Sequence, residues 1–165
     1  MQGLIESRQG HGFAICVALI FGGTQAGRYY VSAENAGTGI FLVGGLAGLL
    51  ALYLFAWLLR NFGRWFGGQA SLREVRVGFG WGLMPWTLLF LFLTAALAVS
   101  GDPAFLANFY WIFFIGFIYG YAVLLSSLSV ALRLSIWKTF FCLVVAVLVS
   151  VFPLTWFLQT LSALI

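Results

Sequence analysis

Residues 77–101 read VGFGWGLMPWTLLFLFLTAALAVSG, a run that contains no Asp, Glu, Lys or Arg. Three more charge-free runs cover residues 35–59, 103–132 and 139–165. An α-helix rises about 1.5 Å per residue, so about 20 apolar residues cross the hydrocarbon core of a bilayer. Each run is therefore long enough to form a transmembrane helix. The last two exceed a single span, and we expect their helices to tilt or to extend beyond the hydrocarbon.

The composition of the whole chain agrees with a membrane protein. Of its 165 residues, 63% are apolar and 7% are charged, and the mean hydropathy is +1.07. Soluble domains carry about 25% charged residues, which cover their surface. This chain has too few charges to build a water-exposed shell, so its composition excludes a soluble globular domain.

A fifth apolar segment covers residues 12–27 and is near the lower limit for one span. The segment also fits the apolar core of a secretory signal peptide, since Val31-Ser32-Ala33 is an acceptable cleavage site. Arg28 follows the segment, however, and the small-residue site lies further from the apolar core than cleavage normally allows. We therefore favour a retained first helix.

We expect one integral membrane domain over residues 1–165, an all-α polytopic bundle of five transmembrane helices. The expected helices cover residues 12–28, 39–62, 77–100, 105–128 and 137–162. The N-terminus and the loops around residues 60–76 and 133–138 then share one side. That side carries seven of the eight basic residues and two acidic ones, a net charge of +5, whereas Arg28, Glu34 and Asp102 give the other side −1. Cationic loops stay in the cytoplasm, so we expect a cytoplasmic N-terminus and an external C-terminus.

Five residues near the expected helix ends are candidate interfacial anchors. Arg and Lys reach lipid phosphates from helix ends, and Trp prefers the headgroup region. The anchors are Arg60, Arg64, Trp65, Arg133 and Lys138. Binding to the bilayer and its anionic lipids explains the net charge of +4 and the pI of 9.4, without nucleic acid as a partner.

Catalytic and metal-ligating residues do not gather in one place along the chain. His11 is the single histidine and lies on the side opposite Glu34 and Asp102, so no catalytic triad can form across the membrane. Cys16 and Cys142 both fall in apolar segments, and we expect small buried side chains rather than a disulfide or a metal site. We therefore expect no enzyme, no metal and no cofactor.

An ion-coupled transporter usually places an ionisable side chain inside the membrane, whereas the charged residues within the expected spans, Arg28, Arg60 and Lys138, all lie near span ends. The polar side chains in or near the spans are expected to form helix–helix hydrogen bonds. They include Asn108, Ser126, Ser127, Ser129 and Gln159. A role as a transporter or channel component is therefore the alternative rather than the leading interpretation.

Glycines at four-residue spacing are expected to pack the helices, because apolar burial alone does not drive association inside lipid. The pairs are Gly23/Gly27, Gly44/Gly48, Gly78/Gly82 and Gly116/Gly120. Pro85 and Pro153 lie inside the third and fifth helices, where each removes one backbone hydrogen bond, so we expect kinks there. Thr87, Ser150 and Thr155 are close enough to satisfy the freed carbonyls.

The segment at residues 67–78 reads GGQASLREVRVG and combines turn chemistry with cationic charge. Its paired glycines permit a sharp turn, and Ser71 followed by Glu74 fits a capping box that opens a helix. The two arginines then lie at the membrane surface. The candidate residues for docking a partner or lipid are Gly67, Gly68, Ser71, Arg73, Glu74 and Arg76.

This segment, with Pro85 seven residues after it, resembles the Yip family of Ypt/Rab-interacting membrane proteins. The resemblance implies a five-helix bundle without recognised catalytic residues, and in eukaryotes a link to membrane trafficking and Rab GTPase binding. Eukaryotic members have a long polar cytoplasmic N-terminal region, whereas about eleven residues precede the first helix expected here. We therefore favour a prokaryotic plasma (inner) membrane over Rab binding. The leading hypothesis is a non-enzymatic scaffold, assembly or accessory subunit of a membrane protein complex, with a membrane-protein partner or a second copy.

Overall fold

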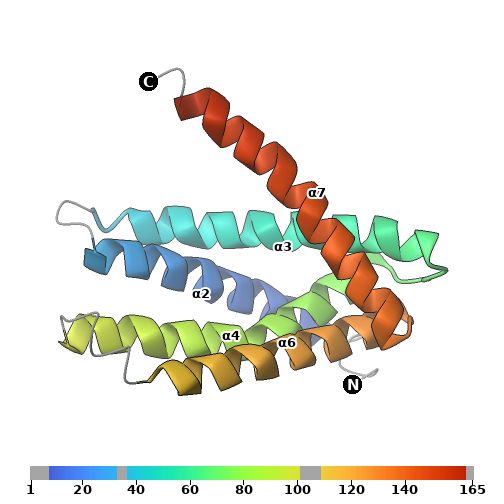
Figure 1. Ribbon diagram of the computed structural model, residues 1–165, viewed down its shortest axis with the longest axis horizontal. Coiled ribbons are helices and arrows are strands. Elements are labelled where there is room, and N and C mark those ends of the chain that lie inside the picture. The colour runs from blue at the N-terminus through green and yellow to red at the C-terminus, as the bar shows by residue number, and fades with distance from the viewer. Residues whose placement is uncertain (1–7, 33–36, 101–108, 163–165) are drawn as a thin grey trace.

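A computed structural model describes residues 8–32, 37–100 and 109–162. Within these ranges the chain forms five α-helices and no β-strand. The helices are α2 (Arg8–Ser32), α3 (Ile40–Trp65), α4 (Leu72–Ser100), α6 (Tyr110–Leu132) and α7 (Ile136–Ser162) (Figure 1). The expected all-α bundle of five helices is thus confirmed.

Helix α2 lies between α3 and α4 and packs along both of them (Figure 1). Helix α6 packs along α4, and α7 crosses α3 and then diverges from it toward its C-terminal end (Figure 1). Helix α2 contributes Ala14, Val17 and Ala18 to the hydrophobic core. Retention of this first helix stays a prediction.

Several helix boundaries differ from the sequence-based expectation by three or more residues. Helix α2 covers Arg8–Ser32 rather than residues 12–28, and α3 ends at Trp65 rather than at residue 62. Helix α4 begins at Leu72 rather than at residue 77, because the cap at Ser71 opens it ahead of the apolar run. Helix α6 ends at Leu132 rather than at residue 128. The hydroxyl groups of Ser126 and Ser129 donate to carbonyls of their own helix, at 2.8 and 2.9 Å, and therefore do not end it. The expected start of α6 at residue 105 lies outside the described residues.

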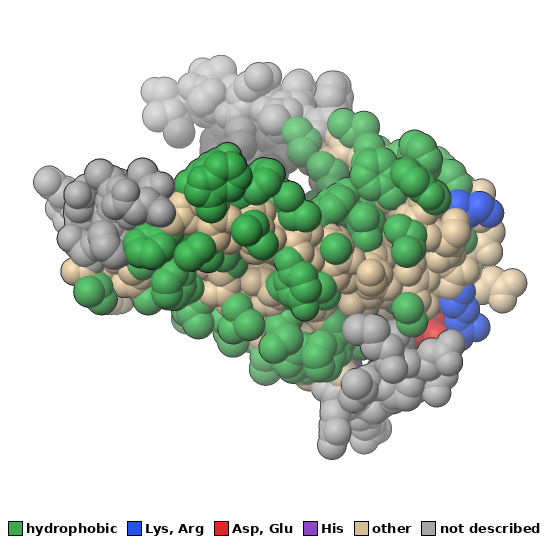
Figure 2. All heavy atoms as spheres, turned by 60° about the horizontal axis from the view of Figure 1, so that its bottom comes forward, with side chains coloured by type: hydrophobic (Ala, Val, Ile, Leu, Met, Phe, Trp, Pro, Cys, Tyr) green, Lys and Arg blue, Asp and Glu red, His purple; other side chains and the backbone are tan. Residues whose placement is uncertain are grey.

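Three of the described helices are long and apolar enough to cross a membrane, over Ile40–Trp65, Leu72–Val99 and Tyr110–Leu132. Helix α7 adds a shorter apolar stretch at Ile136–Val151. Large hydrophobic side chains such as Leu42, Leu50 and Ile115 are exposed, and Figure 2 shows hydrophobic side chains over much of the visible face. The chain is therefore a polytopic membrane bundle. That α2 and α7 also cross the bilayer stays a prediction.

One part of the core lies beside the α3–α4 and α6–α7 turns. Its side chains come from four helices, and the largest fully buried ones are Leu52, Leu59, Val75, Val77, Leu128, Leu132, Thr139 and Cys142. Buried polar side chains in the described ranges are Thr24, Thr87, Ser127 and Thr139. The three threonines donate to carbonyls of their own helices. The fully buried part of the described core therefore contains no charged side chain.

Helices α2 and α3 cross through small residues that allow their backbones to meet. A Cβ atom added at Gly22 would overlap the carbonyl oxygen of Gly44, and one added at Gly48 would overlap the carbonyl oxygen of Ala18. The expected pair Gly44/Gly48 thus lies in a helix contact. A Cβ atom added at Gly23, by contrast, would meet no atom of a neighbouring helix within 4 Å. Of the expected pair Gly23/Gly27, the prediction was wrong for Gly23, whereas a Cβ atom at Gly27 would lie 3.1 Å from Thr94 of α4 and 3.3 Å from Phe41 of α3. The α2–α3 crossing itself runs through Ala18, Gly22 and Ala26.

The two helix prolines lie inside continuous helices. Pro85 is within α4, whose ribbon is not straight, although the position of the bend along the helix stays a prediction (Figure 1). Thr87 donates to Leu83 at 2.9 Å, not to the carbonyl four residues before Pro85 that the proline leaves unpaired. The Ser150 hydroxyl likewise bonds Ala146 at 2.7 Å. The prediction that Thr87 and Ser150 satisfy the carbonyls left unpaired by Pro85 and Pro153 was therefore wrong. The side chains of Pro153 and Thr155 lie outside the described part of α7.

Candidate docking surfaces

The turn between α3 and α4 is built on a glycine with left-handed backbone geometry. Gly67 has φ +90°, which glycine adopts without steric cost. The N–H of Gly68 donates to the carbonyl of Gly63 at 2.8 Å and closes the end of α3. A Cβ at Gly68 would lie 3.0 Å from the carbonyl oxygens of Gly63 and Leu132. The paired glycines therefore give both the turn, as expected, and its close packing against the end of α6.

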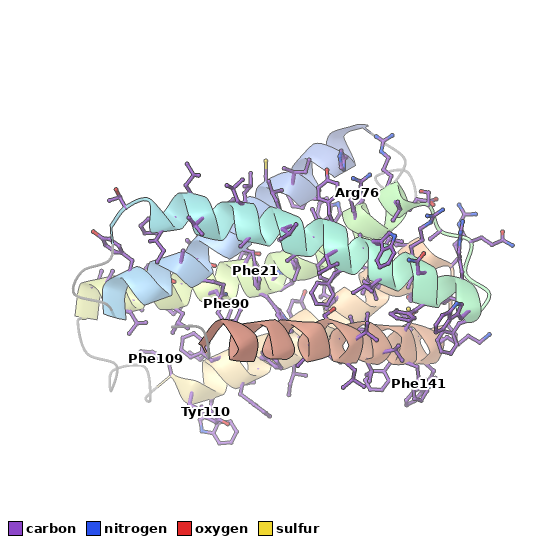
Figure 3. All side chains as sticks on the ribbon, turned by 90° about the horizontal axis from the view of Figure 1, so that it is seen from above. Phe21, Arg76, Phe90, Phe109, Tyr110 and Phe141 are labelled. Carbon is purple, nitrogen blue, oxygen red and sulfur yellow. The ribbon has the colours of Figure 1, made fainter. Side chains whose placement is uncertain are left out.

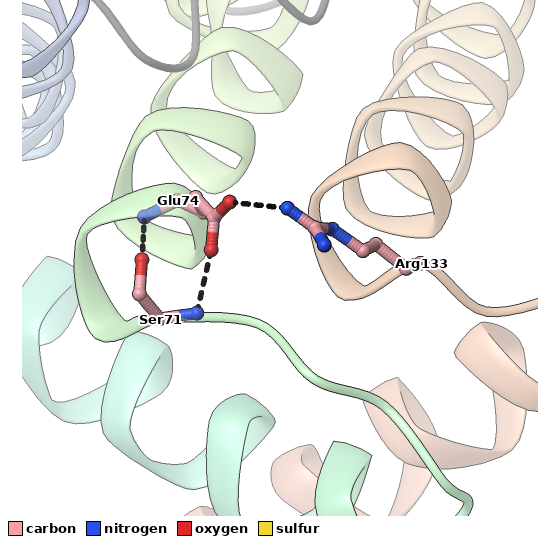
Figure 4. Close-up of polar contacts among 3 residues, drawn as sticks. All are labelled: Ser71, Glu74 and Arg133. Atoms are coloured by element: carbon pink, nitrogen blue, oxygen red, sulfur yellow. Dashed lines mark hydrogen bonds and ion pairs between the residues drawn. The ribbon is translucent and has the colours of Figure 1, made fainter.

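The capping box expected at the start of α4 is present (Figure 4). The backbone N–H of Ser71 donates to Oε2 of Glu74 at 2.6 Å, and the N–H of Glu74 donates to Oγ of Ser71 at 3.2 Å. This reciprocal pair satisfies two N–H groups that a helix start otherwise leaves without a partner. The first turn of α4 is therefore fixed relative to the preceding loop.

An ion pair joins this turn to the end of α6, which the sequence did not indicate. Nη2 of Arg133 donates to Oε1 of Glu74 at 3.1 Å (Figure 4). Arg133 occupies the position after α6 with φ 57°, a left-handed conformation that is uncommon for arginine. The N–H of Leu134 donates to Ser129 and completes the helix end. Glu74 thus holds both turns together and is not free to meet a partner.

Arg76 points toward α3 rather than outward. Its Cζ lies 4.7 Å above the centre of the Tyr53 ring, and its Nε donates to the carbonyl of Leu72 at 3.3 Å. Figure 3 shows Arg76 where α2, α3 and α4 approach one another. His11, ahead of the apolar run of α2, has a pKa below its ordinary value, because burial disfavours the imidazolium and because Arg76 and Arg73 add positive charge.

The charged side chains that the structure describes all lie at one end of the bundle, which we call the basic end. They are Arg60, Arg64, Arg73, Glu74, Arg76, Arg133 and Lys138. In Figure 2 the visible Lys, Arg and Glu side chains occupy this end. Arg64 and Lys138 are exposed, and Trp65 and Trp137 beside them are 78% and 75% exposed. Arg60, by contrast, is half-buried, with Nε unbonded to any described residue.

The second surface is a groove between α2 and α3, with a volume of about 380 Å³. Residues at helical spacing line it: Phe21, Gly22, Gln25 and Ala26 on α2, and Ile40, Val43, Gly44, Ala47, Gly48 and Ala51 on α3. Its walls are almost entirely apolar, and the Gln25 amide forms no hydrogen bond within the described structure. Sequence reasoning paired the α3 glycines but missed this groove, because its α2 wall depends on how the two helices cross.

The cysteines and the histidine do not converge. Cys142 is buried and its Sγ donates to the carbonyl of Leu59 at 3.4 Å, as a small core side chain. Cys16 is exposed, so the expectation of burial was wrong for it, because it lies on the face of α2 turned away from α3 and α4. Across the described ranges, no group of three His, Cys, Asp or Glu side chains is placed to hold a metal ion.

Comparison with known proteins gives one match. The family model described as Yip1 domain matches residues 6–158, which include all five helices except the last residues of α7. No curated protein and no solved structure matches the chain.

Proposed function

The chain belongs to the Yip1 domain family, and on that basis we propose that it is a non-enzymatic scaffold or accessory subunit of a complex in a prokaryotic plasma membrane. In this proposal the basic end faces the cytoplasm, and a transmembrane helix of a partner protein packs into the α2–α3 groove. The groove is the observation that carries the proposal.

The shape and chemistry of the groove fit a helix better than a polar ligand. Its α3 wall presents Ala47 and Ala51, which are four residues apart on one helix face, beside Gly44 and Gly48, whose backbones already meet α2. Small residues at this spacing let a second backbone approach closely, and close packing supplies the contact energy between helices in lipid. Gln25 adds an amide that a polar side chain of the partner helix can bond.

The interior of the bundle supports a structural role over ion transport. The buried polar side chains in the described ranges are hydroxyls, and those of Thr24, Thr87 and Thr139 are occupied by carbonyls of their own helices. Coupled carriers instead use ionisable groups inside the membrane as ion or proton sites. We therefore retain the scaffold as the leading function and the transporter or channel component as its alternative.

A blocking substitution in the groove tests the proposal. Ala47 lies exposed on the groove wall, so Ala47→Trp fills the groove without entering the core. The matched control is Leu46→Trp, one residue away on the exposed face of α3 but outside the groove lining. The tagged proteins are purified from native membranes in a mild detergent, and copurifying membrane proteins are identified by mass spectrometry.

We expect wild type and Leu46→Trp to retain the same membrane protein in stoichiometric amount, and Ala47→Trp to lose it. Retention by both variants would exclude the groove as the docking surface. Purification of a free-standing chain, or of an assembly that contains only copies of this chain, would contradict the role of an accessory subunit.

A further inference from the structure

One face of α3 changes its chemistry along the helix. Apolar side chains come first, aromatic side chains follow, and cations come last, at the basic end. Successive members are three or four residues apart and therefore share one helix face. All are exposed except the half-buried Arg60, and in chain order they are Leu46, Leu50, Tyr53, Trp57, Arg60 and Arg64. We call this set the α3 stripe, and none of its members lines the α2–α3 groove.

The two arginines of the α3 stripe lie one helical turn apart and carry unpaired guanidinium groups. Neither forms a hydrogen bond or an ion pair with another described residue. The Nε atom of Arg60 is covered by protein, so part of this side chain is held in place although it has no acceptor there. A buried donor of a charged group is costly without an acceptor. An anion bonded to the guanidinium groups would offset that cost.

The aromatic part of the α3 stripe is fixed by a contact with α4. Cζ of Arg76 lies 4.7 Å above the centre of the Tyr53 ring, and Nε of Arg76 donates to the carbonyl of Leu72 at 3.3 Å. Tyrosine and tryptophan prefer the depth of the lipid headgroups, between the hydrocarbon and water. Tyr53 and Trp57 therefore mark the boundary between the apolar and the cationic part of the stripe.

The order of side chains along the stripe matches a lipid better than a free anion. A guanidinium presents N–H groups in a fixed plane that matches phosphate oxygens. Leu50 lies ten residues before Arg60, which is a rise of about 15 Å and equals about half of a hydrocarbon core of about 30 Å. The acyl chain of a lipid whose phosphate lies at Arg60 can therefore follow exposed apolar side chains through one leaflet. Free phosphate would use the arginines alone.

We propose that the α3 stripe binds an anionic glycerophospholipid, with the lipid phosphate against Arg60 and Arg64 and an acyl chain along Leu50 and Leu46. The proposal does not depend on the scaffold function, because the stripe and the groove use different residues of α3 and the lipid requires no partner protein.

Native mass spectrometry of the full-length protein in a maltoside detergent measures the Kd of the first lipid bound. The probe is dioleoyl phosphatidylglycerol, and dioleoyl phosphatidylcholine has the same chains and a phosphate but no net charge. Inorganic phosphate is added as a competitor. We expect phosphatidylglycerol to bind more tightly than phosphatidylcholine and to resist displacement by phosphate. Equal affinity for the two lipids would overturn the proposal, and displacement by phosphate at a concentration similar to that of the lipid would assign the arginines to a free anion instead.

The cationic part of the stripe is tested at constant net charge. Arg60→Gln should raise the Kd for phosphatidylglycerol about tenfold or more, the effect of losing one charge-assisted hydrogen bond. Arg60→Lys, which keeps the charge but not the planar group, should recover part of the affinity. The control is the double variant Arg60→Gln with Asn61→Arg, which restores the charge one position away from the stripe. We expect it to bind as weakly as Arg60→Gln. Full recovery in the double variant would mean a general surface potential and overturn the site.

The apolar part of the stripe is tested with a pair of leucines. Leu50→Asn should raise the Kd several-fold, because the acyl chain loses an apolar contact. Leu54→Asn is the matched control, since Leu54 is also exposed on α3 but lies outside both the stripe and the groove lining. An equal effect of both substitutions, or no effect of either, would overturn the position of the acyl chain. Circular dichroism of each variant checks that the helices are intact.

Discussion

At the residue scale, two positions with positive φ set the geometry of the basic end. Gly67 turns the chain from α3 into α4 at φ +90°, and Arg133 turns it from α6 toward α7 at φ 57°. A left-handed conformation costs a residue with a Cβ about 1–2 kcal/mol. Glycine meets this requirement at the first turn. At the second turn Arg133 has a Cβ and carries the steric cost of the left-handed conformation, which its ion pair with Glu74 partly offsets.

Replacing Gly67 should therefore destabilise the bundle through the backbone alone. No atom lies within 4 Å of a Cβ added there, so Gly67→Ala creates strain without a clash. We expect it to lower the free energy of unfolding by about 1–2 kcal/mol, measured by denaturant titration in detergent micelles. The control is Gly39→Ala, since Gly39 also has open space but φ −59° at the start of α3. A similar loss in both variants would rule out backbone strain as the cause.

Arg133 allows the strain and the ion pair to be separated. Its side chain is 60% exposed, and exposed ion pairs contribute about 0–1 kcal/mol. Arg133→Gly removes the pair but also the left-handed strain, and glycine is the usual residue at this helix-end position. We expect Arg133→Gly to match or exceed the stability of wild type, and Arg133→Ala to fall below it by up to about 1 kcal/mol. Equal loss in both variants would mean that the ion pair outweighs the strain.

At the element scale, the helices could be predicted because charge-free runs and cap residues are local signals. The capping box at Ser71 and Glu74 needed only their spacing of three residues, and it formed as expected. The end of α6 was predicted too early, since the helix continues to Leu132. Ser126 and Ser129, expected to bond other helices, instead donate to carbonyls of α6 itself. The face of α2 that packs could not be found from glycine spacing, because Ala18 and Ala26 serve as well as glycine there.

The α2–α3 crossing should depend on which of two neighbouring glycines is changed. Gly22→Val places side-chain atoms against the backbone of Gly44, whereas Gly23→Val meets open space. Both substitutions change the helix propensity of α2 equally, so their difference isolates the contact. We expect Gly22→Val to be less stable than Gly23→Val by about 1–3 kcal/mol in the same denaturant assay. Equal stability would contradict the close crossing.

Substitutions in the α3–α4 turn and substitutions in the groove should release different ligands. Because Arg76 faces inward over Tyr53, we expect Arg73→Gln with Arg76→Gln to keep the copurifying protein while losing bound anionic lipid, by about 1 kcal/mol for each charge. Ala47→Trp should show the reverse pattern. Native mass spectrometry of the purified complexes measures both losses. Release of the protein by the double arginine variant, with Arg60→Gln and Arg64→Gln tolerated, would place the docking surface at the turn instead.

At the scale of the whole molecule, the described charged side chains are concentrated at one end of the bundle axis. The basic end holds six described cations against the single carboxylate of Glu74, and the three long apolar helices α3, α4 and α6 lead away from it. This arrangement could be predicted from the sequence, because alternate loops of a polytopic chain return to the same side. The lateral groove could not, since it joins two helices whose packing is not a local property.

The central claim is that the chain crosses the membrane five times with the basic end in the cytoplasm, which places the groove within the bilayer. Reporter fusions test it most directly, with alkaline phosphatase active only outside and green fluorescent protein fluorescent only inside. We expect a fusion at Gly68 to report the cytoplasm and a fusion after Ile165 to report the exterior, as the cationic loop around residues 60–76 requires. A cytoplasmic reporter after Ile165 would mean an even number of spans and contradict the account.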